Sequence, residues 1–332
     1  MNATVLARAP LRIALGGGGT DLPSHYSRHG GFVLSGSIDR HVRMRVSQAD
    51  GPLYSLDHLE QEAVSEPARI RHPILRAAIT RHGDGRPLEL VSEGDVAPGT
   101  GLGSSGAYAV CAVKAVGLLS GRDLGSGDLA ESACAIEIED MGRTVGKQDQ
   151  YASTFGGVNA FTFAPDGAVD VRRLDLPEVM RDALREQFLL FFTGQSRSAA
   201  QILSGQVERT LAGDSELERN LLATAAAARA GSQAMEGGDL DAFAELMNEQ
   251  WALKRERLAH VGMGRIEELR DLALAGGARG AMLMGAGGGG YLLAYAPDPS
   301  RLRAAFARAG APELPFDLDR EGCVARVATA AE

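Results

Sequence analysis

One segment joins a strand to a helix through glycine, and it constrains the fold more than any other part of the chain. Residues 98–107 read Pro-Gly-Thr-Gly-Leu-Gly-Ser-Ser-Gly-Ala, between a β-rich stretch at 87–92 and an Ala- and Val-rich stretch at 107–119. The first turn of a helix presents unpaired N–H groups, and glycine lets phosphate oxygens approach the backbone. The segment therefore predicts a phosphate-binding loop, to which Ser104 and Ser105 add hydroxyl groups for a phosphate or its Mg²⁺.

Other interpretations of this segment fit less well. Gly101, Gly103 and Gly106 match the dinucleotide-binding G-x-G-x-x-G pattern, but the segment 285–290 matches the same pattern by chance. Pro98 interrupts the direct strand-to-glycine junction of a Rossmann unit, and no Lys-Ser or Lys-Thr follows the glycines as in a Walker A loop. For the segment taken alone, a loop that only makes a tight turn is the alternative.

The composition favours a chain with a large core and small-molecule partners. Its 332 residues are 45% hydrophobic, which favours two lobes over one. The formal net charge of −9 disfavours nucleic acid, whereas a few basic residues around one pocket suffice for an anionic small molecule. The three cysteines form no CxxC pair, and the chain shows neither a signal peptide nor an apolar run long enough to span a bilayer. We therefore expect a cytoplasmic protein with no membrane or nucleic-acid partner.

Hydrophobic periodicity and glycine or proline stop signals predict an α+β chain. Prolines, glycine and many charges between 165 and 185 place the domain boundary at 183/184. The residues 147–150 are expected in a polar loop, and the last strand is expected to complete the C-terminal lobe. Helices are expected at 73–82, 107–119, 129–141, 197–211, 215–235, 239–259, 264–275 and 299–309, and strands at 4–15, 31–48, 87–92, 158–163, 187–193, 280–284, 291–296 and 323–327.

Three motifs in a fixed order resemble those of the GHMP kinases, the superfamily of galactokinase, homoserine kinase, mevalonate kinase and phosphomevalonate kinase. The runs 17–23 and 146–151 further resemble the D-glycero-D-manno-heptose 7-phosphate 1-kinases. The resemblance implies a two-lobed fold, with a mixed N-terminal domain at 1–183, a ferredoxin-like C-terminal domain at 184–332 and the active site between them. The motifs are Ala9-Pro10-Leu11-Arg12-Ile13 through Gly19-Thr20-Asp21-Leu22-Pro23, then Pro98-x-x-Gly101-Leu102-Gly103-Ser104-Ser105, then Gly285-Ala286-Gly287-Gly288-Gly289-Gly290.

The chain departs from the family pattern at two positions. Gly106 stands where the family usually has Ala or Ser. Met282 stands where a lysine is expected just before the third glycine motif, which puts in question how an anionic substrate is held.

The resemblance also implies roles for individual residues. Asp149 corresponds to the family's catalytic aspartate, a general base for the attacked hydroxyl, and Arg12 to a cation that stabilises the transferred phosphoryl group. Glu137 corresponds to the Mg²⁺-binding glutamate, assisted by Ser104, with Glu139 and Asp140 as competitors. Each of these charges also has an ordinary structural interpretation, as a solvated loop, helix or surface residue.

The remaining assignments concern the two substrates. The basic residues available to hold a substrate phosphate are His25, Arg28, Arg40, Arg197, Lys254 and Arg255. Surface charges of this kind are usually solvated, and only Arg197 is expected to face the cleft. Residues expected to bind ATP are Pro98, Gly99, Gly101, Leu102, Gly103, Ser104, Ser105 and Gly106. Residues expected to bind the acceptor are Gly18, Gly19, Thr20, Asp21, Lys147, Arg197, Gly287, Gly288 and Gly289.

Together these expectations describe a kinase that uses ATP and Mg²⁺ to phosphorylate a sugar phosphate. The first candidate acceptor is the 1-hydroxyl of a heptose 7-phosphate, which gives a 1,7-bisphosphate. The alternatives are a kinase for an unphosphorylated fucose, galactose or uronic acid, and a regulator that binds ATP and sugar without turnover. Arg12, Glu137 and Asp149 together disfavour the regulator, because a binding protein needs no base. The sequence leaves the sugar, the anomer and a possible homodimer open.

Overall fold

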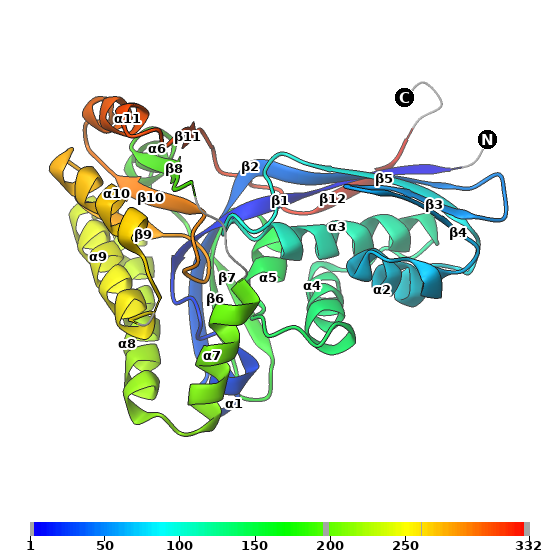
Figure 1. The fold of residues 1–332 in the computed structure, drawn as a ribbon, viewed down its shortest axis with the longest axis horizontal. Coiled ribbons are helices and arrows are strands. Elements are labelled where there is room, and N and C mark those ends of the chain that lie inside the picture. The colour runs from blue at the N-terminus through cyan, green and yellow to red at the C-terminus, as the bar shows by residue number, and fades with distance from the viewer. Residues whose placement is uncertain (1–2, 195–198, 260, 329–332) are drawn as a thin grey trace.

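The computed structural model describes residues 3–194, 199–259 and 261–328, and its strands form two sheets (Figure 1). An eight-stranded sheet has the order β12-β1-β2-β5-β3-β4, with β6 beside β2 and β7 beside β6. A four-stranded sheet has the order β11-β8-β10-β9. The strands are β1 (Thr4–Gly16), β2 (Gly31–Gln48), β3 (Tyr54–Asp57), β4 (Gln61–Val64), β5 (Leu88–Gly94), β6 (Val158–Phe163), β7 (Val169–Arg173), β8 (Phe188–Phe192), β9 (Gly280–Leu283), β10 (Tyr291–Tyr295), β11 (Glu313–Leu314) and β12 (Val324–Val327).

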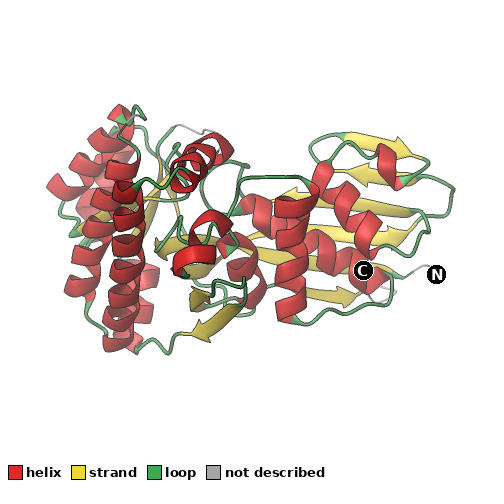
Figure 2. Ribbon diagram, turned by 90° about the horizontal axis from the view of Figure 1, so that it is seen from below, coloured by secondary structure: helices red, strands yellow, loops and turns green. Residues whose placement is uncertain are grey.

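Helices cover one face of the larger sheet and stand beside the smaller one (Figures 1 and 2). The helices are α1 (Pro23–His29), α2 (Pro73–His82), α3 (Ser104–Leu119), α4 (Ser126–Ala135), α5 (Gln148–Phe155), α6 (Glu178–Glu186), α7 (Ala199–Leu211), α8 (Ser215–Gly237), α9 (Leu240–Arg257), α10 (Gly264–Ala275) and α11 (Pro299–Arg308). A π-helical turn, Ile136–Asp140, comes directly after α4. No described helix is both long and apolar enough to cross a membrane.

Helix α3 is the central element of the first lobe. It packs against both β1 and β2, and most of its side chains are small and buried, including Ala107, Val110 and Cys111. Small side chains let a helix lie close to a sheet, and the burial of this apolar surface favours folding. The close packing fixes the N-terminal end of α3, where the glycine loop begins.

The last strand does not complete the C-terminal lobe, so that expectation is wrong. Strand β12 pairs antiparallel with β1, in a register that sets Val5 opposite Val327. The chain therefore returns to the first lobe after it has built the second. Figure 1 shows the start of β1 and the end of β12 at the same end of the larger sheet. The 183/184 boundary stays a prediction.

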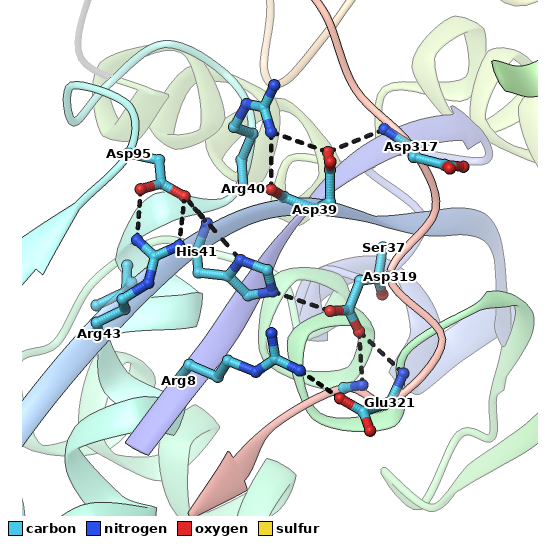
Figure 3. A network of polar contacts seen from close by, with 12 residues as sticks. Arg8, Ser37, Asp39, Arg40, His41, Arg43, Asp95, Asp317, Asp319 and Glu321 are labelled. Carbon is cyan, nitrogen blue, oxygen red and sulfur yellow. Dashed lines mark hydrogen bonds and ion pairs between the residues drawn. The ribbon is translucent and has the colours of Figure 1, made fainter. Parts of the chain in front are cut away.

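A buried polar network holds the segment before β12 against β2 (Figure 3). His41 Nε2 lies 2.9 Å from Asp319 Oδ2, and both side chains are buried. Asp319 Oδ1 accepts hydrogen bonds from the N–H groups of Glu321 and Gly322. Buried charged groups are stable only when paired or hydrogen-bonded, so this network explains how the returning segment is anchored.

A candidate active site between the lobes

A cavity of about 790 Å³ lies where the two lobes meet, and it is lined by segments from both. The first lobe contributes the start of α3, the segment 17–22 and the start of α5. The second contributes α7, the end of α9 and the loop after β9. A cavity of this size, at an interface between lobes, is typical of small-molecule sites.

The glycine loop before α3 has the geometry expected of a phosphate site. Gly103 has φ +75° and precedes the first helical residue, Ser104, so it occupies a left-handed conformation that glycine favours. The loop and the first turn of α3, through Gly106, line the cavity. The first-turn N–H groups have no partner within the helix, so they and the helix dipole favour an anion here.

The two residues with proposed catalytic roles form an ion pair beside this loop. Arg12 Nε and Nη2 donate to Asp149 Oδ1 at 2.8 and 2.5 Å, and Arg12 Nη1 donates to the carbonyl oxygen of Gly101 at 2.5 Å. Arg12 is almost fully buried, whereas Asp149 is partly exposed and lines the cavity. A Cβ on Gly103 would lie 3.0 Å from Arg12 Cγ and 3.3 Å from Asp149 Cγ. The glycine loop therefore contacts the pair directly.

Asp149 lies in the first turn of α5, so the expectation of a polar loop at 147–150 is wrong. The N–H of Gln148, the first residue of α5, donates to Asp21 Oδ2 at 3.1 Å. Asp21 Oδ1 accepts from the N–H of Gly19 at 3.1 Å, and burial raises the pKa of Asp21. Asp21 thus supplies the helix with a cap from a distant segment and links the 17–22 segment to the helix that carries Asp149.

Glu137 is buried in the π-helical turn, at the edge of the cavity. Its Oε1 accepts from Ser105 Oγ at 2.6 Å and from Arg143 Nη1 at 2.9 Å, and its Oε2 accepts from Gln150 Nε2 at 2.7 Å. Burial raises the pKa of Glu137, while the bonds from Ser105 and Arg143 lower it. The hydroxyl next to Glu137 is that of Ser105, whereas the sequence expectation named Ser104.

The third glycine motif packs against the phosphate loop before α3, backbone on backbone. A Cβ on Gly285 would lie 2.7 Å from Gly101 Cα, and one on Gly290 would lie 2.0 Å from the carbonyl oxygen of Thr100. The N–H of Tyr291 donates to that carbonyl at 3.2 Å. Only glycine permits such a close approach, so the motif joins the two lobes at the cavity.

Several residues expected to bind substrates have other contacts in the structure. Thr20 Oγ1 donates to the carbonyl oxygens of Gly17 and Phe32, which gives it a structural role. Lys147 Nζ pairs with Glu131 at 2.8 Å and donates to Gly167. Arg197 lies outside the described residues. The expected residues that do not line the cavity are Pro98, Leu102, Thr20, Lys147 and Gly287, whereas Gly18, Gly19, Asp21, Gly99, Gly101, Gly103, Ser104, Ser105, Gly106, Gly288 and Gly289 line it.

Two cations at the end of α9 line the cavity, although nothing in the sequence distinguishes them from other charges. Lys254 Nζ donates to the carbonyl oxygens of Leu283 and Gly285 at 2.6 and 2.9 Å, so it lies beside the start of the third glycine motif. A cation thus reaches this loop from α9, while Met282 is buried in β9. Arg257 is the second cation. In the sequence, the family pattern indicated a cation near this loop, but at position 282 in β9 and not on α9.

Comparisons with known proteins agree with this geometry. The GHMP kinases N terminal domain matches residues 71–157 and the GHMP kinases C terminal domain matches residues 225–312, which together are more than half of the chain. The chain belongs to the GHMP kinase family, which confirms the fold and makes it an ATP-dependent small-molecule kinase.

Individual proteins are similar to most of this chain. The chain is 27% identical over 310 residues to D-glycero-alpha-D-manno-heptose 7-phosphate kinase of Campylobacter jejuni, with 90% of this chain and 91% of that protein covered. It is 26% identical over 318 residues to the bifunctional fucokinase/GDP-fucose pyrophosphorylase of Arabidopsis thaliana, with 89% of this chain but 30% of that protein covered. A solved D-glycero-D-manno-heptose 1-phosphate kinase from Bacteroides thetaiotaomicron has the same fold, with a TM-score of 0.78 at 22% identity, over 98% of this chain and 100% of that one.

Proposed function

We propose that this protein transfers the γ-phosphoryl group of ATP to the anomeric hydroxyl of a heptose 7-phosphate, giving a 1,7-bisphosphate. The Arg12–Asp149 pair carries the proposal, because it sets a carboxylate and a guanidinium together between the α3 glycine loop and the 17–22 segment. The near full-length similarity to the heptose 7-phosphate kinase of Campylobacter jejuni supports this choice of acceptor. We expect the enzyme to act in the cytoplasm.

In this proposal, Asp149 accepts the proton of the attacked hydroxyl. Arg12 holds Asp149 through Oδ1 alone, and within the described residues no hydrogen bond goes to Oδ2. That oxygen is therefore available to receive a proton from the sugar. The Arg12 guanidinium also balances negative charge on the oxygens of the transferred group, which is where phosphoryl transfer needs stabilisation. The N–H groups at the start of α3 orient the ATP phosphates.

The residues also fit a magnesium ion. Mg²⁺ prefers one or two carboxylates together with phosphate oxygens and water, and it neutralises phosphate charge when bound. Glu137 supplies a buried carboxylate at the cavity, and the Ser105 hydroxyl adjoins it at 2.6 Å. We propose these two residues, with Ser104 next to them, as the magnesium site.

An unphosphorylated sugar is the second candidate acceptor, because a bifunctional plant fucokinase/GDP-fucose pyrophosphorylase is also similar to this chain. A screen of ATP consumption separates the two. Heptose, sedoheptulose and hexose phosphates should be compared with free fucose, galactose and glucuronic acid. The proposal predicts the highest kcat/KM with a heptose 7-phosphate. Faster turnover of any free sugar would refute the choice of acceptor, and no turnover of any sugar would refute the assignment as a sugar kinase.

A further inference from the structure

Five cationic side chains line the cavity, and they fall into two groups. Three of them pair with a carboxylate: Arg12 with Asp149, Arg143 with Glu137, and Arg209 with Asp214. Lys254 and Arg257 lack such a partner among the described residues, and their hydrogen bonds go to neutral groups. Unpaired cations that line a cavity are candidates for binding an anionic ligand.

Arg257 has more N–H donors than hydrogen-bond partners among the described residues. Its Nη1 donates to Asn220 Oδ1 at 2.7 Å and to Thr224 Oγ1 at 2.6 Å, and its Nη2 donates to the carbonyl oxygen of Gly18 at 3.3 Å. A guanidinium carries five N–H donors, so these three bonds leave two without a partner in the described part of the chain. The neutral contacts hold the side chain in one orientation without neutralising its charge.

Lys254 is in a similar position one turn earlier on α9. Its ammonium has three donors, and two of them bind the carbonyl oxygens of Leu283 and Gly285. Burial and the nearby Arg257 and Arg12 lower the pKa of Lys254 to about 7, and burial lowers that of Arg257 to about 10. An anion between the two side chains would relieve this unfavourable accumulation of positive charge.

The position of Arg257 favours the acceptor over the nucleotide. Arg257 contacts Gly18, in the segment that carries Asp21, and two side chains of α8. None of its hydrogen bonds goes to residues 98–106, where the N–H groups of α3 already provide an anion site. Arg257 thus offers the cavity donors that are separate from the N–H groups of α3.

We infer that Lys254 and Arg257 form the binding site for the phosphate group that the acceptor already carries. The inference rests on the proposed function, in which the acceptor is a sugar phosphate. It transfers the role expected of Arg197 to two side chains of α9. A phosphate dianion would accept charge-assisted hydrogen bonds from the ammonium and from the fork of the guanidinium.

The test compares two acceptors in matched variants of the full-length enzyme. Arg257→Gln and Lys254→Met each remove one charge, and the control is Arg255→Gln. Arg255 lies on the same helix, but it pairs with Glu267 at 2.6 Å and does not line the cavity. KM and kcat should be measured for a heptose 7-phosphate and for the same heptose without its phosphate, together with the dissociation constant of ATP.

The inference predicts that both variants bind the phosphorylated acceptor more weakly while the other ligands are little affected. Removing a charge-assisted contact should raise KM for the phosphorylated acceptor on the order of 10-fold or more. KM for the free heptose and the affinity for ATP should change less than about two-fold, as should all values for Arg255→Gln. Weaker ATP binding with an unchanged acceptor KM would assign the cations to the nucleotide and overturn the inference. An equal loss for both acceptors would overturn it as well.

A measurement on the unaltered protein covers the case in which a variant does not fold. Inorganic phosphate should inhibit competitively against the sugar phosphate and not against ATP, and competition against ATP alone would contradict the inference. Wild-type enzyme that turns over no sugar would refute the proposed function. If the wild-type enzyme turns over the sugar phosphate and both variants keep its KM values for the two acceptors, only the phosphate site is refuted.

Discussion

Two glycine-rich loops share one sequence pattern but have different roles. Residues 101–106 and 285–290 both read G-x-G-x-x-G. The first continues into α3, whose first-turn N–H groups have no partner within the helix and whose residues 104–106 line the cavity. The second joins β9 to β10, and its glycines let it pack on the first loop at Thr100 and Gly101. The element after each glycine run accounts for the difference, because a helix start presents N–H groups to an anion, whereas a run between two strands permits a close backbone contact.

The largest effect should come from the residue that the first loop contacts. Asp149→Asn keeps the shape of the side chain but removes the proton acceptor, so kcat should fall on the order of 10²- to 10⁴-fold. ATP affinity should stay nearly constant, because the N–H groups of α3 are unchanged. Steady-state kinetics and nucleotide titration measure both quantities. A near-normal kcat would show that Asp149 is not the base. Catalysis would then rest on positioning of the substrate by Arg12 and Asp21.

The second loop should matter for stability. A Cβ at Gly290 (φ +103°) would lie 2.0 Å from the Thr100 carbonyl oxygen, whereas one at Gly277 (φ +101°) would meet nothing within 4 Å. Both alanine variants carry the same φ strain, so their difference isolates the contact between the loops. Gly290→Ala should lower the free energy of unfolding by roughly 2 kcal/mol more than Gly277→Ala. Equal losses in urea titrations would show that the loops do not pack as described.

A smaller effect is expected where α3 meets α5. A Cβ on Gly106 would lie 2.6 Å from Asp149 Cβ and 3.0 Å from its carbonyl carbon. This contact explains why glycine stands at 106. Gly106→Ala should displace Asp149 and lower kcat by about 10-fold, because small displacements of a reacting group are costly. The control Gly237→Ala, in α8 with nothing within 4 Å, should leave kcat unchanged. An unchanged kcat in both variants would contradict the contact.

The smallest effect concerns pH. The pKa of Lys254 is lowered to about 7 by burial and by the neighbouring cations Arg257 and Arg12, so its charge is lost as pH rises through 7. The KM for the phosphorylated acceptor should therefore rise roughly two- to five-fold from pH 6.5 to 8.5, since Arg257 stays charged. In Lys254→Arg the charge persists, and KM should change much less. If KM changes with pH to the same extent in the wild type and in Lys254→Arg, Lys254 does not contribute to binding the acceptor.

Much of the fold could be predicted from local patterns. The strands Gly31–Gln48 and Val158–Phe163 and the helices Pro73–His82 and Gly264–Ala275 have the predicted bounds, because their periodicity and their glycine or proline signals are local. Helix α5 was missed because it is short and polar, and its first N–H is capped by Asp21, far away in the sequence. The pairing of β12 with β1 is likewise a long-range contact that no local pattern encodes.

The candidate site, like the fold, has one part that local sequence patterns predict and one part that they do not. The α3 loop could be predicted, because a strand, glycines and a helix succeed one another along the chain. Lys254 and Arg257 are ordinary charges at the end of a helix in sequence. Only the packing of α9 beside the 17–22 segment and the third glycine motif brings them into the cavity.

The most direct test of the proposed reaction is to identify the product formed from ATP and a heptose 7-phosphate. We expect the acceptor phosphate to lie near Lys254 and Arg257 and the attacked hydroxyl to lie beside Asp149. Phosphorus NMR of the reaction mixture should show a second phosphate on the sugar, coupled to the anomeric proton, with ADP formed in equal amount. A second phosphate at any other carbon, or ADP formed without a phosphorylated sugar, would contradict the proposed reaction.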